Sequence, residues 1–335
     1  MSCQGCKVSD LTYQFDLQGQ YNEALTDKVK EHLQRNDVPV TLTKENKLKV
    51  PEHHIREILD FFEDHMETDQ IFFRTSQGEW SPLSEISEVL ETSWIDEIIL
   101  EELVHCHYQP ILRSDGELFG YELLARFTDG EGNMVYPGEL FQAARLRGRL
   151  YALDRVCRMA AVRHAARLDK VKAFINFIPT SIYSPEFCLR STMQLASQLN
   201  LDPQQLVFEV VETDKVDDVE HLKKILTYYK DKGFMYALDD VGEGFSTIEL
   251  LTGIEPHYMK LDRKFVSDVH EDPEKQRVAH LFLEKARSMG TIPLAEGIEQ
   301  QQEYQWLKDA GYVLFQGYYF GRPQSEPVPR DALNF

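Results

Sequence analysis

The sequence has little that would place it in a membrane or in an oxidising compartment. It contains no apolar run of the roughly 18 residues that a membrane span requires, and its first residues, MSCQGCKVSD, lack the apolar core of a signal peptide. The few cysteines are odd in number and scattered, as in reduced cytosolic proteins: Cys3, Cys6, Cys106, Cys157 and Cys188. We therefore expect a cytoplasmic protein with no membrane insertion and no structural disulfide.

Basic residues are also scarce. The 335-residue chain has 36 Lys and Arg against 56 Asp and Glu, which gives a formal net charge of -20. This balance argues against binding of a nucleic-acid polymer, because such binding relies on Lys and Arg to neutralise phosphates. With 42% hydrophobic residues and no low-complexity tract, the chain has the composition of a folded protein. An anionic substrate would need bound cations or a local basic group.

The chain has no repeat of fixed period, but from about residue 105 short β-rich runs alternate with helical stretches. The runs are KAFINF, LVFEVVE, FMYALDD, HYMKLD, IPLAEGIE and YVLFQGYYF. This alternation predicts a parallel sheet covered by helices, with enough units to close a (β/α)8 barrel of the TIM type. An open doubly wound sheet is the alternative.

The first hundred residues predict a small α+β module of a different kind. VTLTKENKLKV has the pattern of a hairpin, PEHHIREILDFFEDHM that of an amphipathic helix, and QIFFRTSQGEW that of a strand. We therefore expect an accessory or regulatory module over residues 1–100 and the barrel over 101–335. The sequence does not identify a ligand for the module.

Polar residues lie at or near the carboxyl ends of six predicted barrel strands. They are Asn176, Glu209, Asp239, Lys260, Glu296 and Gln316. In barrel enzymes the active site lies at that end of the strands. Strand ends are also polar where they merely meet solvent, but six successive ends that carry an Asn, a Lys and three acids favour one common site.

Two adjacent aspartates, Asp239 and Asp240, end one of these strands. Two carboxylates about 4 Å apart repel by roughly 4 kcal/mol at an effective dielectric near 20, so they need a proton or a cation. Neighbouring strand residues point to opposite faces, and the pair converges only if the chain leaves regular strand geometry. Gly242 and Gly244 allow such a bend.

Further acids from other strand ends, Glu122, Glu209 and Glu296, bring the group to five, with Asn176 as a neutral oxygen donor. This set suits Mg²⁺ or Mn²⁺ and lacks the Cys and His that zinc prefers. Two ions per site would clamp the attacking and leaving oxygens of a phosphoester. Lys260 is either a counter-ion of the acids or an ammonium that orients the attacking water and steadies phosphate charge.

The order of the motifs resembles that of the EAL domain, the phosphodiesterase domain that hydrolyses cyclic di-GMP. The motifs are YQPIL (108–112), YELLARF (121–127), INF (175–177), FEVVE (208–212), LDDVGEGFS (238–246), MKLDRKFV (259–266), AEGIE (295–299) and QGYYFGRP (316–323). The resemblance covers about residues 100–330. It implies a barrel with one antiparallel strand, attack of a metal-bound water with two-metal assistance, linear pGpG as product, and a homodimer formed through the barrel in bacterial second-messenger signalling.

The resemblance also implies a role for each site residue. Glu122, Asn176, Glu209 and Asp239 would hold the first metal, and Asp240 and Glu296 would help Asp239 retain the second. Lys260 would contact the catalytic water, with Gln316 and Glu299 in support. The implied substrate contacts are Gln109, Leu124, Arg126, Asp262, Tyr318 and Pro323, and the implied loop supports are Glu212, Gly242, Glu243 and Gly244.

The chain departs from the family pattern at a few positions. The signature is Glu-Leu-Leu instead of Glu-Ala-Leu, which keeps Glu122 and Leu124. Val241 and Glu243 alter the loop, and His257 replaces an Asp before the lysine. These changes bear on loop conformation and rate, while every metal-binding acid is kept.

The first functional hypothesis is thus a cyclic di-GMP phosphodiesterase. The second hypothesis is a receptor that binds cyclic di-GMP without turnover, and the third is a barrel enzyme for another phosphoester.

Other motifs carry weaker hypotheses. Cys3-x-x-Cys6 resembles half of a zinc or redox site, and Cys106 lies between His105 and His107. Zinc motifs need a second pair of ligands at the right spacing, and the sequence has none, so an incidental terminus is the simpler interpretation.

Overall fold

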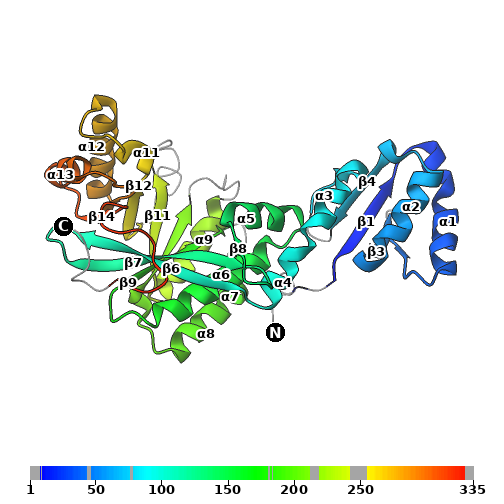
Figure 1. Ribbon diagram of the computed structural model, residues 1–335, viewed down its shortest axis with the longest axis horizontal. Helices are drawn as coiled ribbons and strands as arrows, with labels where there is room; N and C mark the ends of the chain where they lie inside the picture. The colour runs from blue at the N-terminus through cyan, green and yellow to red at the C-terminus, as the bar shows by residue number, and fades with distance from the viewer. Residues whose placement is uncertain are drawn as a thin grey trace. The chain divides into compact units, whose positions relative to one another are not determined.

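The computed structural model describes residues 8, 10–43, 47–75, 78–179, 182, 184–211, 219–241 and 255–328. They form two compact units (Figure 1). One unit comprises the described residues of 2–103 and 128–153, and the other those of 104–127 and 154–328. Residues 128–153 therefore pack with the N-terminal residues although they follow the first two barrel strands. The division of the chain into an N-terminal module, residues 1–100, and a barrel domain, residues 101–335, stays a prediction.

The first unit contains a five-stranded sheet in the order β2-β3-β1-β4-β5. Its strands are β1 (Thr12–Leu17), β2 (Thr41–Leu42), β3 (Leu48–Pro51), β4 (Ile71–Thr75) and β5 (Ser81–Pro82). The central strand β1 pairs antiparallel with β3 and β4 and alternates half-buried and buried residues. The predicted hairpin is confirmed as β2 and β3, whereas β1 and the helix after it were not predicted, although TYQFDL has the period-2 pattern of a strand.

Helices α1 (Gln20–Arg35) and α2 (Ile55–His65) lie together on one face of this sheet (Figure 1). Phe15 of β1 packs edge-on against Phe62 of α2 at 5.2 Å between ring centroids, and both are fully buried. The remaining helices of the unit are α3 (Ile86–Glu91), α4 (Ile95–Leu100), α5 (Pro137–Leu146), and the 3-10 turns η2 (Glu52–His54), η3 (Thr68–Gln70), η4 (Leu83–Glu85) and η5 (Thr92–Trp94).

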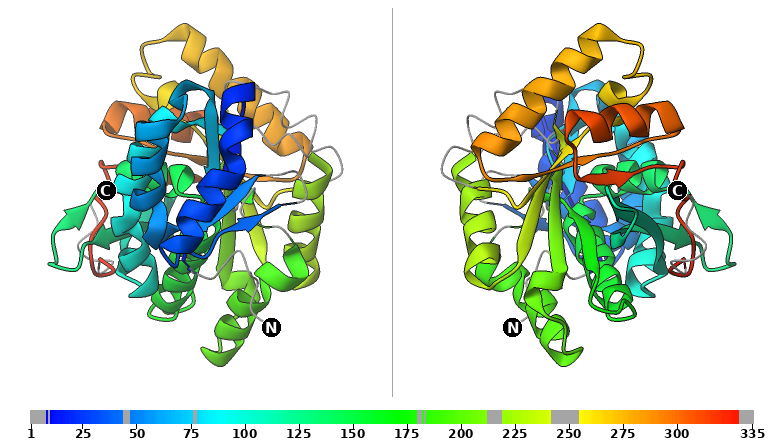
Figure 2. Two further views of the ribbon diagram at one scale, coloured as in Figure 1. Left: turned by 90° about the vertical axis from the view of Figure 1, so that its right-hand side faces the viewer. Right: turned by 90° about the vertical axis from the view of Figure 1, so that its left-hand side faces the viewer.

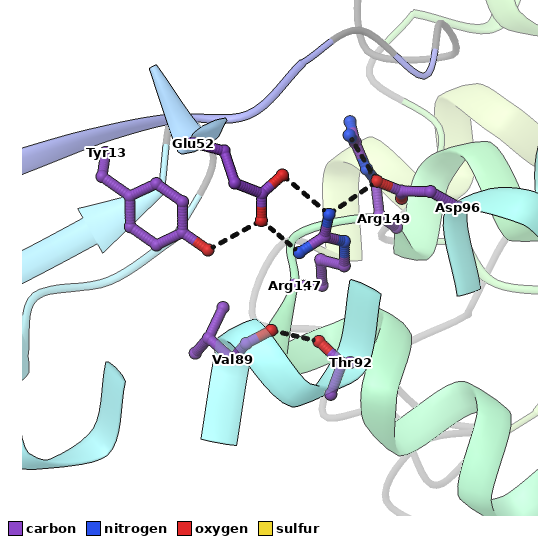
Figure 3. Close-up of polar contacts among 7 residues, drawn as sticks. All are labelled: Tyr13, Glu52, Val89, Thr92, Asp96, Arg147 and Arg149. Carbon is purple, nitrogen blue, oxygen red and sulfur yellow. Dashed lines mark hydrogen bonds and ion pairs between the residues drawn. The ribbon is translucent and has the colours of Figure 1, made fainter. Parts of the chain in front are cut away.

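A buried arginine ties α5 to the rest of this unit. Arg147, 2% exposed, donates to both carboxylate oxygens of Glu52 at 2.7 and 2.8 Å and to Asp96 at 2.7 Å (Figure 3). Arg149 donates to the same Asp96 carboxylate at 2.8 Å, and the Tyr13 hydroxyl donates to Glu52 at 3.3 Å. Two acids from residues before 100 thus hold two arginines at the end of α5.

The second unit is a closed barrel, as predicted. Its strands are β6 (Val104–Arg113), β7 (Leu118–Thr128), β9 (Lys172–Phe177), β10 (Leu206–Val211), β11 (Met235–Val241), β12 (Tyr258–Leu261), β13 (Ile292–Ala295) and β14 (Leu314–Gln316). The short strand β8 (Met134–Val135) belongs to residues 128–153 of the first unit. β6 runs antiparallel to both of its neighbours, β14 and β7, and the other neighbouring barrel strands are parallel. The expected single antiparallel strand is confirmed.

Helices surround the barrel on the outside (Figure 2). They are α6 (Leu150–Ala165), α7 (Pro185–Cys188), α8 (Arg190–Gln198), α9 (Val219–Asp231), α11 (Arg263–Val266), α12 (Pro273–Ser288), α13 (Gln301–Ala310) and the 3-10 turn η7 (Pro203–Gln205). α13 begins with a capping box of Gln300 and Glu303 and ends at Gly311, whose φ of 110° favours glycine. In the described part of the chain, no helix combines the length and apolar character needed to cross a bilayer.

One layer of apolar side chains fills the barrel interior. Each of the eight barrel strands contributes a residue: Ile111, Phe119, Phe174, Val207, Ala237, Tyr258, Leu294 and Leu314. The rings of Phe119, Phe174 and Tyr258 contact one another at centroid distances of 5.2 to 6.3 Å. This layer closes the barrel below the polar strand ends.

The arginine contacts of the first unit predict a stability difference between two matched variants. Arg147→Met leaves Glu52 and Asp96 without their shared guanidinium, and we expect a loss of about 3 kcal/mol, the lower end for breaking a buried pair, because both acids are partly exposed. Arg35→Met removes an exposed pair with Glu31 and should cost below about 0.5 kcal/mol. Urea unfolding followed by circular dichroism measures both; equal losses would contradict the structural role of Arg147.

Candidate active site

The polar strand ends share one inward face with the apolar layer of the barrel. Each site residue follows a residue of that layer by two positions in the sequence. The pairs are Phe174 and Asn176, Val207 and Glu209, Ala237 and Asp239, Tyr258 and Lys260, Leu294 and Glu296, and Leu314 and Gln316. Because strand side chains alternate with period 2, a residue two positions on points to the same face. The six polar residues therefore form a second layer at the carboxyl ends of the strands.

Lys260 lies at the centre of this layer. Its Nζ is 2.9 Å from Asp239 Oδ1, 3.0 Å from Glu209 Oε1, 3.0 Å from Glu296 Oε2 and 3.8 Å from Glu122 Oε2. Its side chain is 1% exposed. One ammonium thus faces four carboxylates from four other strands or their ends. The structure brings together the residues that the sequence predicted for a common site.

Glu122 is fixed by amide donors. Asn176 Nδ2 donates to its Oε1 at 2.8 Å, and Gln316 Nε2 donates to its Oε2 at 2.6 Å. Gln316 Nε2 also lies 3.2 Å from Gln109 Oε1. Amide donors from β9 and β14 therefore hold one carboxylate of β7 and orient its oxygens, while Gln109 of β6 accepts a hydrogen bond from Gln316.

Glu122 and Glu209 differ in how their negative charge is stabilised. Burial raises the pKa of Glu122, but Lys260 and the hydrogen bonds from Gln316 and Asn176 outweigh it, so the net pKa is lowered. Burial holds the pKa of Glu209 well above its usual range in spite of Lys260. Both Glu209 oxygens are buried and neither has a hydrogen bond of good geometry, although Oε1 is close to Lys260. Glu209 therefore needs a proton or a cation in addition to Lys260, and burial likewise holds the pKa of Glu296 well above its usual range.

The aspartate pair sits in a β-bulge. β11 and β12 pair as Leu238 with Met259 and then as Val241 with Leu261, so Asp239 and Asp240 together stand opposite Lys260. The strand geometry is irregular at the place where the sequence required it. Asp239 reaches Lys260, whereas only the backbone of Asp240 is described.

A cavity of about 210 Å³ opens beside these carboxylates. Its lining includes Gln109, Glu122, Glu296, Glu299, Gln316, Tyr318 and Arg263. Arg263 pairs with Glu299 at 2.7 Å. Gly317, also in the lining, lies so close to the loop after β13 that a Cβ there would come within 2.0 Å of the Ile298 carbonyl oxygen. Only glycine permits this approach, which holds the Glu296 loop beside Gln316.

Arg263 was not named among the predicted site residues. It directly follows Lys260-Leu261-Asp262 in the sequence, and this position three residues after Lys260 was the available signal. Asp262, predicted as a substrate contact, caps α11 by accepting a hydrogen bond from Lys264 N–H. Its contact with substrate stays a prediction.

Of the other residues singled out in the sequence, Tyr318 lines the cavity, His257 lies at the amino end of β12, away from the carboxylate layer, and several lie outside the described residues. Tyr318 is 45% exposed, with the Arg322 guanidinium 4.3 Å from its ring centroid. His257 accepts a hydrogen bond from Tyr236 N–H at 3.3 Å. The loop residues Glu212, Gly242, Glu243 and Gly244 lie outside the described residues, as do Cys3 and Cys6.

The described site fits hard divalent cations in donor type and charge. Its donors are four carboxylates and an amide, all oxygen ligands of the kind that Mg²⁺ and Mn²⁺ prefer. A single ammonium cannot balance four carboxylates, and Glu209 keeps unsatisfied buried oxygens. No three His, Cys, Asp or Glu side chains among the described residues form a ready ligand cluster. The Lys260 ammonium occupies the central position between the four carboxylates.

Comparison with known proteins identifies a family model. The model of the EAL domain matches residues 94–323. The probable cyclic di-GMP phosphodiesterase PdeG of Escherichia coli K12 is 31% identical over 223 residues, which are 64% of this chain and 44% of that protein. The cyclic di-GMP phosphodiesterase NbdA of Pseudomonas aeruginosa is 25% identical, over 67% of this chain and 29% of that protein. The chain thus spans less than half the length of these curated relatives.

Solved structures show the same fold. A standalone versatile EAL protein from Vibrio cholerae O395, in its c-di-GMP bound form, is 34% identical and superimposes with a TM-score of 0.60 over 69% of this chain and 95% of that one. The FimX EAL domain of Pseudomonas aeruginosa, bound to c-di-GMP, has a TM-score of 0.64 at 21% identity, over 71% and 97% of the two chains. The second likeness supports the fold alone.

The central lysine predicts a stability effect that does not depend on activity. Lys260→Met keeps the length of the side chain but removes the only ammonium that the described residues place among the four carboxylates. We expect the free energy of unfolding to fall by roughly 3–5 kcal/mol in chelator. Lys232→Met, at an exposed lysine, should change it by less than about 0.5 kcal/mol. Denaturant unfolding of both variants checks this, and a neutral Lys260→Met would refute the electrostatic role.

Proposed function

The chain belongs to the EAL domain family, and on this basis we propose that it hydrolyses cyclic di-GMP to linear pGpG. The observation that carries the proposal is the convergence of Lys260 with Glu122, Glu209, Asp239 and Glu296 in one layer at the strand ends. Water would add to the phosphorus, the P–O3′ bond would break, and the ribose oxygen would take up a proton. Linear pGpG with a 5′-phosphate results.

Divalent cations, Mg²⁺ or Mn²⁺, are part of the proposal. The residues to hold them are Glu122, Asn176, Glu209 and Asp239, with Asp240 and Glu296 for a second ion. Such ions supply Lewis acidity and lower the pKa of water. Glu209 Oε2, which is buried with no hydrogen-bond partner, supports this assignment, because a cation would balance its charge.

Lys260 has an electrostatic role in this proposal. Burial lowers its pKa, but the charges of Asp239, Glu122, Glu209 and Glu296 raise it well above the usual range. Among these carboxylates the amine is therefore held in its protonated form. An ammonium at this place can donate a hydrogen bond to the attacking water and stabilise the charge that develops on the phosphate.

Substrate binding is assigned to the ribbon of β6 and β7 that continues from the site. Gln109 pairs directly across the strands with Glu122, and Leu124 and Arg126 follow on the same face of β7. Arg126 offers a guanidinium to a substrate phosphate, and a bidentate contact of this kind is strong. Homodimer formation through the barrel and a regulatory role of residues 1–100 remain predictions.

Metal dependence tests the enzyme directly. We expect the protein with Mg²⁺ or Mn²⁺ to convert cyclic di-GMP to pGpG, and excess EDTA to reduce the rate at least about 10³-fold, because the four carboxylates would then lack their cations. Nucleotide separation by chromatography measures the product. Tight binding without turnover under every metal would instead establish the receptor, and neither binding nor turnover would favour another phosphoester.

Two substitutions separate the roles of the site residues. Glu122→Ala removes a metal ligand, so both activity and metal affinity should fall. Lys260→Ala should retain metal binding, measured by calorimetry, while kcat falls about 10²–10³-fold through loss of a positioned donor. Lys232→Ala, at an exposed lysine, serves as control. An unchanged kcat in Lys260→Ala would leave Lys260 as a counter-ion only.

A further inference from the structure

The ribbon of β6 and β7 has two faces that differ in burial. Cross-strand pairs place Gln109 opposite Glu122, His107 opposite Leu124, and His105 opposite Arg126. Directly opposed residues of an antiparallel pair have side chains on the same face. His105, His107, Leu124 and Arg126 are all half-buried, whereas the intervening Cys106, Tyr108 and Phe127 are buried on the other face.

These pairs form one strip that begins at the carboxylate layer. Residues two positions apart on a strand are separated by about 7 Å, so His107 lies one step and His105 two steps beyond Gln109. The rings of the two histidines are 5.4 Å apart. The charge of Arg126 acts on both of them. The strip therefore combines a guanidinium, two imidazoles and the side chain of Leu124.

The chain segment after the cavity holds His107 in place. This segment runs from Gln316 and Tyr318 to Gln324, which exchanges two backbone hydrogen bonds with Tyr108 at 2.7 and 3.1 Å. The His107 ring is hydrogen-bonded to the backbone of Pro323. The cavity lining and the histidine strip are thus joined by one short segment.

The imidazoles offer hydrogen bonding without a full charge. Partial burial, together with Arg126, lowers the pKa of His105 and of His107, so both rings are neutral near pH 7. A neutral imidazole has one donor and one acceptor nitrogen. Since the Pro323 carbonyl takes the N–H of His107, the other nitrogen is an acceptor. Guanine presents N–H donors on its base-pairing edge, and its flat surface stacks on imidazole rings.

We propose that His107, backed by His105, is a specificity residue that contacts a guanine of the dinucleotide away from the phosphate under attack. The proposal rests on the proposed hydrolysis of cyclic di-GMP and deepens it. Arg126 and Leu124 would then hold the same half of the substrate from the neighbouring strand. A small phosphodiester that occupies only the carboxylate layer would not reach the strip.

The test compares cyclic di-GMP with bis(p-nitrophenyl) phosphate, a small diester. His107→Ala should raise KM for cyclic di-GMP about five- to thirty-fold, the effect of one lost hydrogen bond and stacking contact, with kcat within about two-fold. Its kcat/KM for the small diester should stay unchanged. His105→Ala should give a smaller rise, about two- to five-fold. His107→Gln, which keeps an acceptor, should recover part of the loss.

Controls separate this inference from the proposed function. His280→Ala, at an exposed histidine of α12, should behave as wild type. If wild type turns over cyclic di-GMP but His107→Ala has an unchanged KM, or loses rate equally on both substrates, the inference alone fails. If wild type neither binds nor hydrolyses cyclic di-GMP, the proposed function fails and the inference with it. Equilibrium binding of cyclic di-GMP to Lys260→Ala, with and without His107→Ala, repeats the comparison when turnover is absent.

Discussion

The barrel site depends on one electrostatic constraint: three buried carboxylates and the half-buried Glu296 face a single ammonium. Lys260 lies within 3.0 Å of three of them and 3.8 Å of the fourth. Burial of an uncompensated charge costs free energy. Bound protons or cations must therefore balance the negative charge that Lys260 alone leaves unbalanced. The excess of negative charge stabilises the buried ammonium of Lys260. The same excess would favour the binding of divalent cations. The amide donors on Glu122 and the unsatisfied Glu209 show that this need differs from one acid to the next.

The location of this layer follows from strand periodicity, which is why much of it was predictable. Six polar strand ends appear in the sequence two residues after buried apolar positions, and the barrel places all six on one inward face. Their mutual distances were not predictable, because these depend on barrel closure and on the bulge at Asp239. The pattern also identified β2, β3, α2 and β4, but it gave no contact between distant segments. Arg147 binds Glu52, which is 95 positions away in the sequence, and Asp96, which is 51 positions away. Contacts between such distant residues leave no periodic pattern in the sequence.

The boundary of the family match differs from the boundary between the compact units, and the arginine contacts lie where the two differ. The EAL domain match begins at residue 94, yet residues 128–153 pack with residues before 103. Asp96 lies inside the family match and Glu52 outside it, and Arg147 binds both. The N-terminal residues are therefore packed against part of the family domain by a buried ion pair.

The strand periodicity that forms the carboxylate layer also places the outer residues of the β6–β7 ribbon on the same face. Its register is fixed by backbone pairing, so the face that carries Glu122 and Gln109 must also carry His107 and His105. A one-residue shift would turn all of them away together. In the proposed function the carboxylate layer supplies charge for chemistry at one phosphate, and its described residues are acids, amides and one lysine. The imidazoles and Arg126 lie beyond it, half-buried and held by the Pro323 segment. On our proposal, this outer part of the ribbon would therefore contribute to discrimination between a guanine dinucleotide and a simple diester.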